Sequence, residues 1–584
     1  MIHRLAILVF LCACVPWKSA CGVDSPAEWN PRELCLQTLV KGVPNILKEQ
    51  DPATGRFGTE PWICDDQNDI FPLAVAWATE APSNPYYHDS HVLEAVMKGG
   101  DALVAAQDSR GLWTFRKKDN STWGQTAQPW TYSRWVRAFY LIKDAMPPKR
   151  RQVWEKGLSL GFERLGKALQ TDRSHNKTCH LAMALYCAGQ CFERQDWKRV
   201  ATEFMAKVVA AQSPLGFWSE HSGPVVNYNY VYVDALGTYS AMSGDDSVLD
   251  ALRRAAVFHS TFTYPDGTSV ETVDERNPYH ARIRVNVGFS YTAEGRSFLL
   301  RQFARTKMKL DVDTAASFLL HGATGTGATR DVTTQSMTLL GTNQAAVLRK
   351  QPWFICVSAF VSPLATNRWI QDRQNFVSIY HEREGLILGG GNTKLQPFWS
   401  SFTVGDTAQL RHRSGDQEPH FVPRGDLIHI PAWARLEPME DAFQLSLGYG
   451  REQCRITARP QNDRQVTLIY EATHRSRKPV EGHVTFLPSR HAIVRTAAGK
   501  SATLGNRSAA WSAAELGEWF QYGNMRVHVP SGSKLLWPMM AHNPYKKDGS
   551  SSLDEARLVL CLTFSSAVPR QVVTLEVLEA TSQR

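Results

Sequence analysis

The sequence predicts an α+β multidomain fold, with an N-terminal (α/α) toroid of helical hairpins followed by a C-terminal antiparallel β-sandwich. Three observations predict it. A loop pattern recurs at a fixed period in the first half, apolar residues recur three and four positions apart between these loops, and the pattern changes to short strands near residue 325. The chain has 584 residues, which is enough for two separate cores.

The repeated loop consists of an apolar helical run that ends in Gln, then a glycine, then an aromatic residue. The clearest copies are VAAQDSRGLW and VAAQSPLGFW, whose glycines, Gly111 and Gly216, lie 105 residues apart. An earlier copy places Gly55 before Phe57, and degenerate copies fall at 168–176 and 264–268. Gly55 and Gly111 lie 56 residues apart, so the 105 residues between Gly111 and Gly216 correspond to about two repeats. A repeat of this length is typical of helical hairpins stacked side by side.

The segments between these loops show helical periodicity. Apolar residues three and four apart occur in 91–106, 135–146, 153–169, 181–191 and 197–211. In a ring of hairpins the inner helices end at the same rim, so their loops should converge on one cleft.

The second half of the chain has the composition of a β-sandwich. After the Gly/Thr-rich break GATGTGATRD, short β-branched and aromatic runs such as WFICVSAFV, QVTLIYEA and LVLCLTF alternate with turn signals. No helical segments intervene, which favours a large antiparallel sandwich. We therefore predict a toroid domain over 23–325 and a sandwich domain over 326–584.

The first 22 residues have the features of a secretory signal peptide. Arg4 precedes the apolar run LAILVFLCACVP, and Ala20-Cys21-Gly22 offers a cleavage site. The alternative is a lipid anchor at the cell surface, because Leu11 to Cys14 loosely resembles a lipid-attachment motif. No later stretch is long and apolar enough to span a membrane. The sequence therefore predicts a secreted or periplasmic protein.

Composition excludes several classes of protein. Beyond residue 22 the formal net charge is about +7, and there is no basic helix or RNA-binding motif, so nucleic acid is not an expected partner. The eight remaining cysteines are widely spaced, and Cys179, Cys187 and Cys191 suit a helix core better than a zinc site. We expect no cofactor. A structural divalent metal in the sandwich and the oligomeric state stay open.

Cationic and aromatic side chains interleave at several points. Arg134 and Arg137 flank Trp135, Arg282 and Arg284 follow His280, and His412 lies among arginines in the second domain. Guanidinium groups pair with carboxylates and indoles stack on sugar rings, so the pattern favours an anionic polysaccharide as partner. The predicted rim loops would bring together Trp113, Trp123, Trp130, Asn176, Trp218, Tyr228 and His280.

Two short motifs, together with the layout, carry a resemblance to a known family. His175-Asn176-Lys177-Thr178-Cys179-His180 opens an Ala/Leu-rich helix, and Glu220 to Tyr230 reads EHSGPVVNYNY before another. This resembles polysaccharide lyases of the heparinase II/III and alginate lyase type. Their Asn-Asn-His run is not intact here, and Asn229 stands where the family often has His.

The resemblance implies β-elimination on a uronic-acid-containing polysaccharide. Such an enzyme neutralises the uronate carboxylate so that the adjacent proton can leave, and it then protonates the departing oxygen. Asn176, helped by His180 or Arg282, suits neutralisation. Tyr228 is the first acid-base candidate and Tyr230 the reserve, and His280 suits a partner base or a ligand of the carboxylate. Glu220 suits an orienting role. The predicted substrate-binding residues are His180, Trp113, Trp123, Trp130, Arg134, Trp218, Glu220, Arg282, Arg284 and His412.

Two other functions fit the same sequence. A glycoside hydrolase on the same toroid needs two carboxylates across the cleft, and candidates are Asp65, Asp66, Asp69, Asp89, Glu220, Asp234, Glu271 and Asp274. A noncatalytic carbohydrate-capture protein would use the eighteen tryptophans as stacking surfaces.

Overall fold

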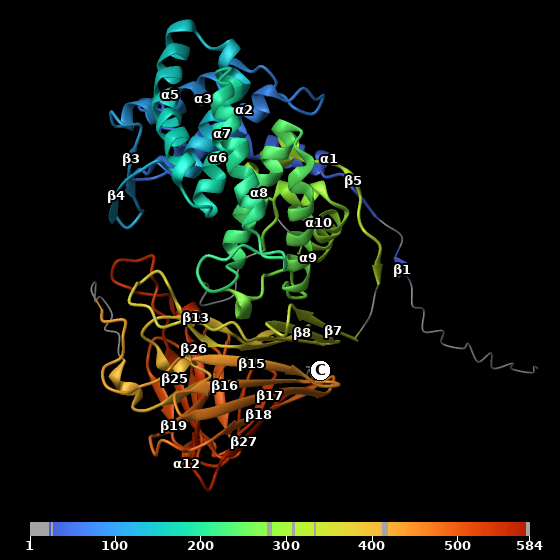
Figure 1. Ribbon diagram of the computed structural model, residues 1–584, viewed down its shortest axis with the longest axis vertical. Coiled ribbons are helices and arrows are strands. Elements are labelled where there is room, and N and C mark those ends of the chain that lie inside the picture. The colour runs from blue at the N-terminus through green and yellow to red at the C-terminus, as the bar shows by residue number, and fades with distance from the viewer. Residues whose placement is uncertain are drawn as a thin grey trace, which may run out of the picture.

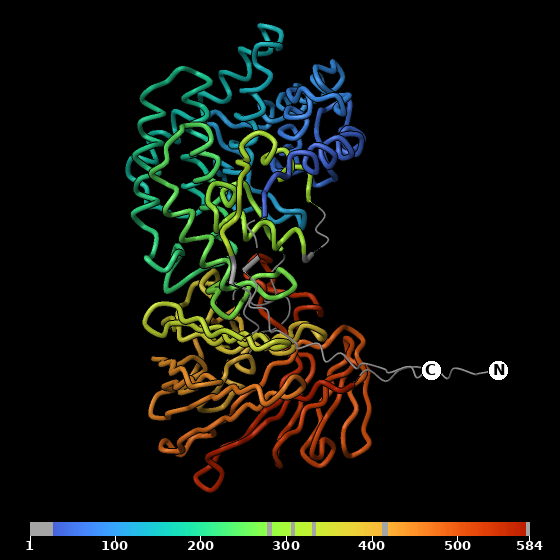
Figure 2. Tube along the Cα trace, turned by 90° about the vertical axis from the view of Figure 1, so that its right-hand side faces the viewer, coloured from blue at the N-terminus to red at the C-terminus, as the bar shows by residue number. Residues whose placement is uncertain are grey.

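The computed structural model describes residues 23, 24, 27–276, 283–306, 310–331, 335–410 and 419–579. Helices form one half of the molecule and a β-sandwich forms the other (Figure 1), and the contacts between the inner helices close the helical half into a ring. The side view shows the two halves stacked end to end, with the N-terminal half above the C-terminal half (Figure 2). This architecture confirms the predicted fold class.

The ring is built from helical hairpins, each with an outer and an inner element. The outer helices are α1 (Arg32–Glu49), α3 (Ser90–Ala106), α5 (Pro148–Thr171), α7 (Gln195–Ala210), α9 (Leu249–Thr261) and α10 (Ala293–Thr306). The inner elements are α2 (Ile70–Ala78), α4 (Pro129–Ile142), α6 (Asn176–Cys191), α8 (Val226–Ser243), the 3-10 turn η5 (Val287–Tyr291) and α11 (Val312–His321).

Contacts between the inner helices close the ring. α2 packs on α4, α4 on α6 and α6 on α8, while α11 contacts both α8 and α2. The burial patterns agree with this order, because α6 is buried almost all round whereas α7 is buried on one face. The inner helices α4, α6, α8 and α11 therefore direct their first turns toward a shared interior.

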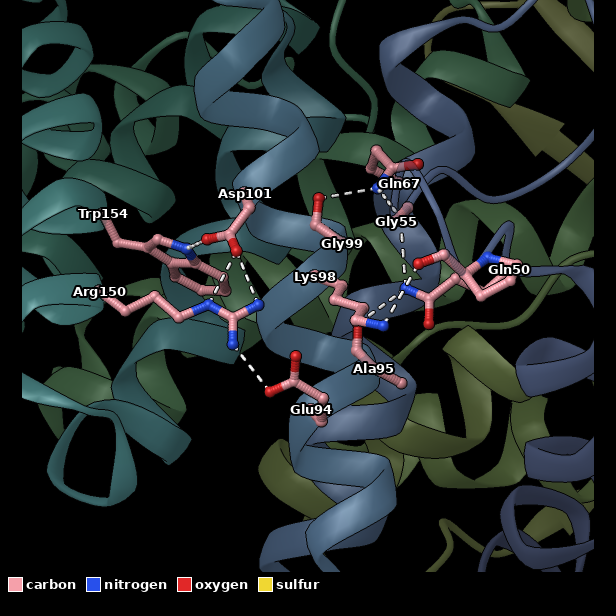
Figure 3. A network of polar contacts seen from close by, with 11 residues as sticks. Gln50, Gly55, Gln67, Glu94, Ala95, Lys98, Gly99, Asp101, Arg150 and Trp154 are labelled. Carbon is pink, nitrogen blue, oxygen red and sulfur yellow. Dashed lines mark hydrogen bonds and ion pairs between the residues drawn. The ribbon is translucent and has the colours of Figure 1, made fainter.

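The repeated Gln is explained by a contact that recurs around the ring. Gln50 Nε2 donates to the carbonyl of Ala95 on α3 at 2.8 Å, as Figure 3 shows. In the same way Gln107 Nε2 donates to Gly157 O on α5 at 3.1 Å, and Gln212 Nε2 donates to Ala251 O on α9 at 2.9 Å. Each Gln thus fastens a loop to the next outer helix.

The repeated glycine allows that loop to lie against the next helix. Gly55 and Gly216 have φ of 71° and 89°, in the left-handed region that favours glycine. A Cβ on Gly55 would meet Lys98 O at 2.3 Å, and one on Gly216 would meet Arg254 O at 2.3 Å. The sequence repeat is therefore a device for packing hairpins side by side.

The sandwich consists of two antiparallel sheets. The sheet nearer the ring runs in the order β22 (Ala509–Trp511), β25 (Lys534–Met539), β26 (Arg557–Phe564), β19 (Val480–Phe486), β12 (Gly385–Leu388), β11 (Val377–His381), β9 (Trp353–Ser358), β8 (Ala345–Lys350) and β7 (Gln335–Leu340), with β14 (Phe402–Val404) beside β19. The second runs in the order β15 (Trp433–Pro438), β16 (Phe443–Tyr449), β17 (Glu452–Asn462), β18 (Gln465–Ala472), β27 (Arg570–Val577), β24 (Met525–His528), β23 (Trp519–Tyr522), β20 (Ile493–Thr496) and β21 (Ser501–Thr503).

Strand β9, in the sheet nearer the ring, is buried on both faces. Successive side chains of a strand point to opposite faces. On β9, Ile355 and Val357 belong to the core between the two sheets, whereas Phe354 and Cys356 belong to the core shared with the helices. This accounts for the continuous apolar run WFICVS, every residue of which is buried.

Short strand pairs complete the fold. They are β1 (Val23–Asp24) with β6 (Arg330–Asp331), β2 (Glu28–Trp29) with β5 (Gly325–Thr326), β3 (Trp113–Arg116) with β4 (Thr122–Thr126), and β10 (Asp372–Asn375) with β13 (Gly391–Thr393). The cysteines from Cys35 to Cys561 are all buried and free, as expected of core residues. Among the helices of the described ranges, none has the length and apolarity needed to cross a membrane.

A buried ion network anchors the segment between β9 and β10. Asp372 accepts from Lys394 Nζ at 2.7 Å and from His429 Nε2 at 2.9 Å, and all three side chains are at most 1% exposed. Lys394 Nζ also donates to Ala365 O. The network thereby ties one loop of the sandwich to two others.

We expect the ring to lose stability as pH falls, because it buries neutral histidines. His259 is fully buried among aromatic rings, and neither ring nitrogen has a hydrogen-bond partner among the residues that the structure describes, so burial lowers its pKa to about 3. In the unfolded chain this pKa is about 6.5, so the unfolded state binds the extra proton below that value. The stability is full above pH 6.5 and falls toward pH 3, with a loss of about 2 kcal/mol at pH 5 from this residue.

Thermal unfolding of wild type and His259→Leu between pH 7 and pH 4 tests this expectation. The variant should show a flatter dependence on pH, since it lacks one titrating group. Identical slopes for the two proteins would contradict the assignment.

Candidate active site at the domain boundary

A tyrosine pair joins the ring to the sandwich. Tyr228 lies in the first turn of α8, and its hydroxyl is 2.8 Å from the hydroxyl of Tyr545, in the loop after β25. Arg276 follows the 3-10 turn η4 (Glu271–Val273), and its guanidinium lies 5.3 Å from the centre of the Tyr228 ring. Arg276 Nη2 also donates to the Tyr545 hydroxyl at 3.4 Å. Two phenols and a cation therefore meet where the domains touch.

The electrostatics of this pair keep the Tyr228 phenol protonated. Burial raises its pKa first, and the neighbouring Tyr545 raises it further, while Arg276 acts in the opposite direction. The pKa of Arg276 is itself raised, because the two tyrosines and Glu220 outweigh its burial. A neutral phenol therefore lies beside a firmly charged guanidinium.

Glu220 and Asn176 lie next to this pair. Burial raises the pKa of the Glu220 carboxyl, whereas Arg276 and the backbone N–H of Asn176 act against that rise. Glu220 Oε1 is buried without a hydrogen-bond partner among the described residues. Asn176 is the first residue of α6 and is 8% exposed, so its backbone lies at the positive end of the helix dipole.

Aromatic rings and cations surround these groups. The rings of Trp123 and Trp369 are 5.0 Å apart, and those of Trp369 and Tyr545 are 5.7 Å apart. Their cationic neighbours at 5.4–5.9 Å from a ring centre are Lys117, Arg368 and Lys547. We call the set Trp123, Asn176, Glu220, Tyr228, Arg276, Trp369 and Tyr545 the interdomain cluster.

A second group of predicted residues lines a cavity inside the ring. It has a volume of about 470 Å³, and its walls come from α4, α6, α8, α11 and the segment before η5. Of the residues named from the sequence, the cavity is lined by Trp130, Arg134, His180, Tyr230, Asp234 and Arg284. Asn286, Asp311 and Asp313 line it as well. We call this space the ring cavity.

Tyr228 and Tyr230 therefore face different environments. Two residues along an α-helix correspond to roughly 200° of rotation, so they lie on nearly opposite sides of α8. Tyr228 contacts the sandwich, whereas Tyr230 is 4% exposed and its hydroxyl lies 3.3 Å from Ser269 Oγ. Tyr230 is thus no substitute for Tyr228 beside Arg276.

Arg134 already has a partner inside the ring. Its Nε and Nη2 donate to the two carboxylate oxygens of Asp313 at 2.9 and 2.6 Å. This bidentate pair occupies the groups that we expected to bind a substrate carboxylate.

Two predicted binding tryptophans belong to the core instead. Trp113 and Trp218 are each 1% exposed, and their indole N–H groups donate to Leu103 O and Val208 O, in the helices that precede them. Trp218 also stacks on Tyr232 at 4.8 Å. Both stand at the same position of the repeated loop in this chain, and their role is to close each hairpin.

Three further predicted residues, His280, Arg282 and His412, lie outside the described residues. Of the carboxylates named for hydrolysis, Glu271 and Asp274 are fully buried. Asp65 accepts from Gln128 Nε2 and Thr131 Oγ1, both at 2.9 Å, so it fastens the start of α4.

The sequence analysis missed three members of the interdomain cluster. Arg276 stands in the run ETVDER, which we considered only for its acids. Trp369 and Tyr545 come from loops of the sandwich, more than 130 residues from Tyr228. The sequence feature that could have indicated them is an aromatic residue close to basic residues, in WIQDR for Trp369 and in NPYKK for Tyr545.

Comparisons with known proteins agree with this architecture. No protein-family profile matches the chain, and no curated protein sequence matches it. Solved structures do match: a Paenibacillus xanthan lyase at TM-score 0.54 and 10% identity, a Streptomyces coelicolor A3 chondroitin AC lyase at 0.53 and 12%, and a further chondroitinase AC lyase at 0.51 and 10%.

The likeness extends over nearly the whole of this chain. Each match covers 95% of it, and the chain spans 58% of the xanthan lyase, 81% of the first chondroitin lyase and 84% of the second. At such low identity the likeness shows the fold, which is the toroid-plus-sandwich fold of these polysaccharide lyases. The fold implied by the resemblance of the sequence motifs is thereby confirmed.

Proposed function

We propose that the protein is a secreted polysaccharide lyase that cleaves a uronic-acid-containing polysaccharide by β-elimination at the interdomain cluster. The observation that carries the proposal is the contact of a protonated phenol, Tyr228, with a charged guanidinium, Arg276, beside a carboxyl whose pKa is raised. Cations and aromatic rings around them suit an anionic sugar chain.

Neutralisation of the uronate carboxylate is assigned to Arg276 and Asn176. A guanidinium can hold a carboxylate through two parallel hydrogen bonds, and Arg276 Nε has no hydrogen-bond partner among the described residues. The side-chain amide of Asn176 can donate to the same group at the N-terminus of α6, where negative charge is stabilised. Charge that develops on the substrate acid group is then stabilised where it appears.

Proton transfer is assigned to Glu220 and Tyr228. Glu220, with a raised pKa and an unpartnered Oε1, is the stronger proton acceptor and takes the proton beside the acid group. The electron pair of the broken C–H bond then forms the new C=C bond. The C–O bond to the leaving sugar breaks with its pair staying on the departing oxygen, to which the Tyr228 hydroxyl gives its proton.

A panel of uronate polymers tests the reaction class. Incubation with a lyase produces ultraviolet absorbance from the conjugated double bond of the new unsaturated end. New reducing ends without that absorbance would identify a hydrolase, and depletion of the polymer without either product would identify a capture protein.

The ring cavity supplies fewer free carboxylates than a hydrolase requires. Both oxygens of Asp313 are held by Arg134, and those of Asp311 accept from the backbone N–H and the hydroxyl of Thr314. Among the described residues that line the cavity, Asp234 is then the one carboxylate without such a partner. Hydrolysis by a pair of acids is therefore the weaker candidate.

Removal of the cation should reduce turnover strongly. We expect Arg276→Ala to lower kcat/KM about a hundredfold, because one preorganised charge opposite the developing anion is lost. Arg253→Ala, which removes an exposed arginine of α9, is the matched control and should leave the rate unchanged. Equal rates for the two variants would remove Arg276 from the mechanism.

A further inference from the structure

We propose that Glu275 is a positioning residue for the proposed reaction, and that its buried carboxylate holds the loop of Glu220 beside Arg276 and Tyr228. The inference rests on the proposed function, since it concerns the residues to which neutralisation and proton transfer are assigned. It gives a role to an acid of the run ETVDER, which the hydrolase alternative would have used for chemistry.

The loop between α7 and α8 carries Glu220 and closes on itself. Ser219 and Pro224 form an isolated antiparallel bridge, so the residues between them make a tight turn. Glu220 is the first residue of that turn, and Tyr228 follows Pro224 by four residues, in the first turn of α8. The position of Glu220 relative to Tyr228 therefore depends on what holds the turn.

Glu275 holds the turn with both its carboxylate and its backbone. The carboxylate accepts from the backbone N–H groups of His221 and Ser222, both at 3.2 Å. Two successive N–H groups that converge on one point form a favourable site for an anion. The backbone N–H of Glu275 also donates to Pro224 O at 2.9 Å. Glu275 is 0% exposed, so solvent does not compete for these hydrogen bonds.

The neighbours of Glu275 extend these contacts to α8. Asp274 Oδ2 accepts from the backbone N–H of Asn227, the residue before Tyr228, at 3.3 Å. Asp274 Oδ1 accepts from the backbone N–H of Arg276 at 2.7 Å, while the Arg276 guanidinium lies 5.3 Å from the centre of the Tyr228 ring. Three consecutive residues thus connect the loop of the proposed base, the helix of the proposed acid and the cation.

A buried arginine of the sandwich compensates the charge of the two acids. Arg373, in β10, is 1% exposed, and its Nη2 donates to Pro224 O and Val273 O at 3.5 Å. Burial lowers the pKa of Arg373, and the charges of Glu275 and Asp274 act against that lowering. Buried carboxylates persist where they are paired and hydrogen-bonded, as these are. The turn is therefore tied to the sandwich as well as to the ring.

Glu275 also acts on Glu220 through its charge. Burial is the largest cause of the raised pKa of Glu220, and the Glu275 carboxylate raises it further, because a nearby like charge disfavours ionisation. The charged and titratable groups that act on Glu220 or are acted on by it are Arg276, Glu275, Lys177, Tyr228 and Tyr232. Removal of the Glu275 charge should therefore lower the pKa of Glu220.

Amide hydrogen exchange of residues 219–225, followed by mass spectrometry, tests the hydrogen bonds without any need for turnover. In the wild type the amides of His221 and Ser222 should exchange slowly, because both are bonded to a buried carboxylate. Glu275→Asp keeps the charge but is one methylene shorter, and it should raise their exchange about tenfold. Unprotected amides in the wild type would overturn the inference even where a variant fails to fold.

Glu275→Gln tests the charge, since it keeps the length of the side chain. A water-soluble carbodiimide reacts with protonated carboxyl groups, so the pH dependence of Glu220 labelling gives the pKa of Glu220. We expect Glu275→Gln to lower that pKa by about one unit and Glu275→Asp to leave it nearly unchanged. The acidic limb of the kcat/KM profile should move to lower pH with it, because this limb reports the base of the free enzyme.

Glu452→Gln is the matched control. Glu452, in β17, is 1% exposed, and its carboxylate also accepts from two successive backbone N–H groups, those of Arg475 and Ser476. Thermal unfolding should show a loss of stability in this variant, whereas the exchange of 219–225 and the labelling of Glu220 should be as in wild type. The same changes in the control, or neither change in the Glu275 variants, would overturn the inference.

Failure of this inference is distinguishable from failure of the proposed function. A protein that yields the unsaturated product, while the Glu275 variants keep the exchange and labelling of wild type, is a lyase without this positioning residue. A protein in which exchange and labelling change as expected, yet which yields no unsaturated product from any uronate polymer, contradicts the proposed reaction instead.

Discussion

Tyr228→Phe is expected to lower kcat by about 10²–10⁴-fold on a cleavable uronate polymer, the range typical of a lost acid-base group. The substitution removes the hydroxyl that would protonate the departing oxygen. It keeps the ring that packs beside Arg276, so folding and the neutralisation of the substrate acid group should persist. KM should therefore change little, because the lost interaction belongs to the transition state.

Rates of unsaturated product formation, measured alongside thermal unfolding, check this expectation. Tyr545→Phe is the matched control, since it removes the partner hydroxyl at 2.8 Å and leaves the proposed donor in place. Tyr545→Phe should lower kcat less than Tyr228→Phe does. If the Tyr228 variant kept normal turnover, or if both variants lost activity to the same degree, the assignment of the proton donor would be refuted.

Asp372→Ala should have the largest effect on stability, with a loss of about 3–5 kcal/mol. The substitution leaves the Lys394 ammonium in a site that is 0% exposed, with no carboxylate opposite it. His429 loses its partner at the same time. An unpaired buried charge costs far more than a pair contributes, because the ion cannot recover its hydration.

Calorimetric unfolding of the variant measures this loss. Asp426→Ala is the control, because it breaks an ion pair between two more exposed side chains. Asp426 is 67% exposed and its partner Lys478 is 35% exposed. Exposed pairs contribute about 0–1 kcal/mol, so this control should unfold almost as wild type does. Equal destabilisation by the two variants would show that burial of the network is unimportant.

The same network links stability to the interdomain cluster. Lys394 holds the carbonyl of Ala365, a few residues before Arg368 and Trp369. Loss of Asp372 should therefore displace the sandwich loop that carries Trp369, and it should weaken binding of the polymer as well as the fold.

The fold was largely predictable because it rests on local patterns. The Gln and Gly of each loop repeat recur in the sequence for the same physical reason, which is the contact of one loop with the next outer helix. The strands after residue 325 were equally predictable. A strand buried on one face alternates apolar and polar residues, and a strand buried on both faces is a continuous apolar run.

The site was predictable only in part. Asn176, Glu220 and Tyr228 stand in short motifs that the sequence displays, and the structure places them near one another. Trp113 and Trp218 were predicted to bind sugar because they are aromatic, but both side chains are buried in the core. A tryptophan in a sequence is as consistent with burial as with sugar binding. Arg134 was visible as a cation, but its partner Asp313 lies 179 residues away.

By itself the sequence determined the ring of hairpins, the sandwich and the helix starts that carry Asn176 and Tyr228, since each of these is signalled by a short residue pattern or by its repetition along the chain. Only the tertiary structure decided that Tyr228 meets Tyr545 and Arg276 while Tyr230 faces the ring cavity. The physical reason is that exposure, charge pairing and proton affinity depend on groups brought together from distant segments, and no local pattern encodes those partners.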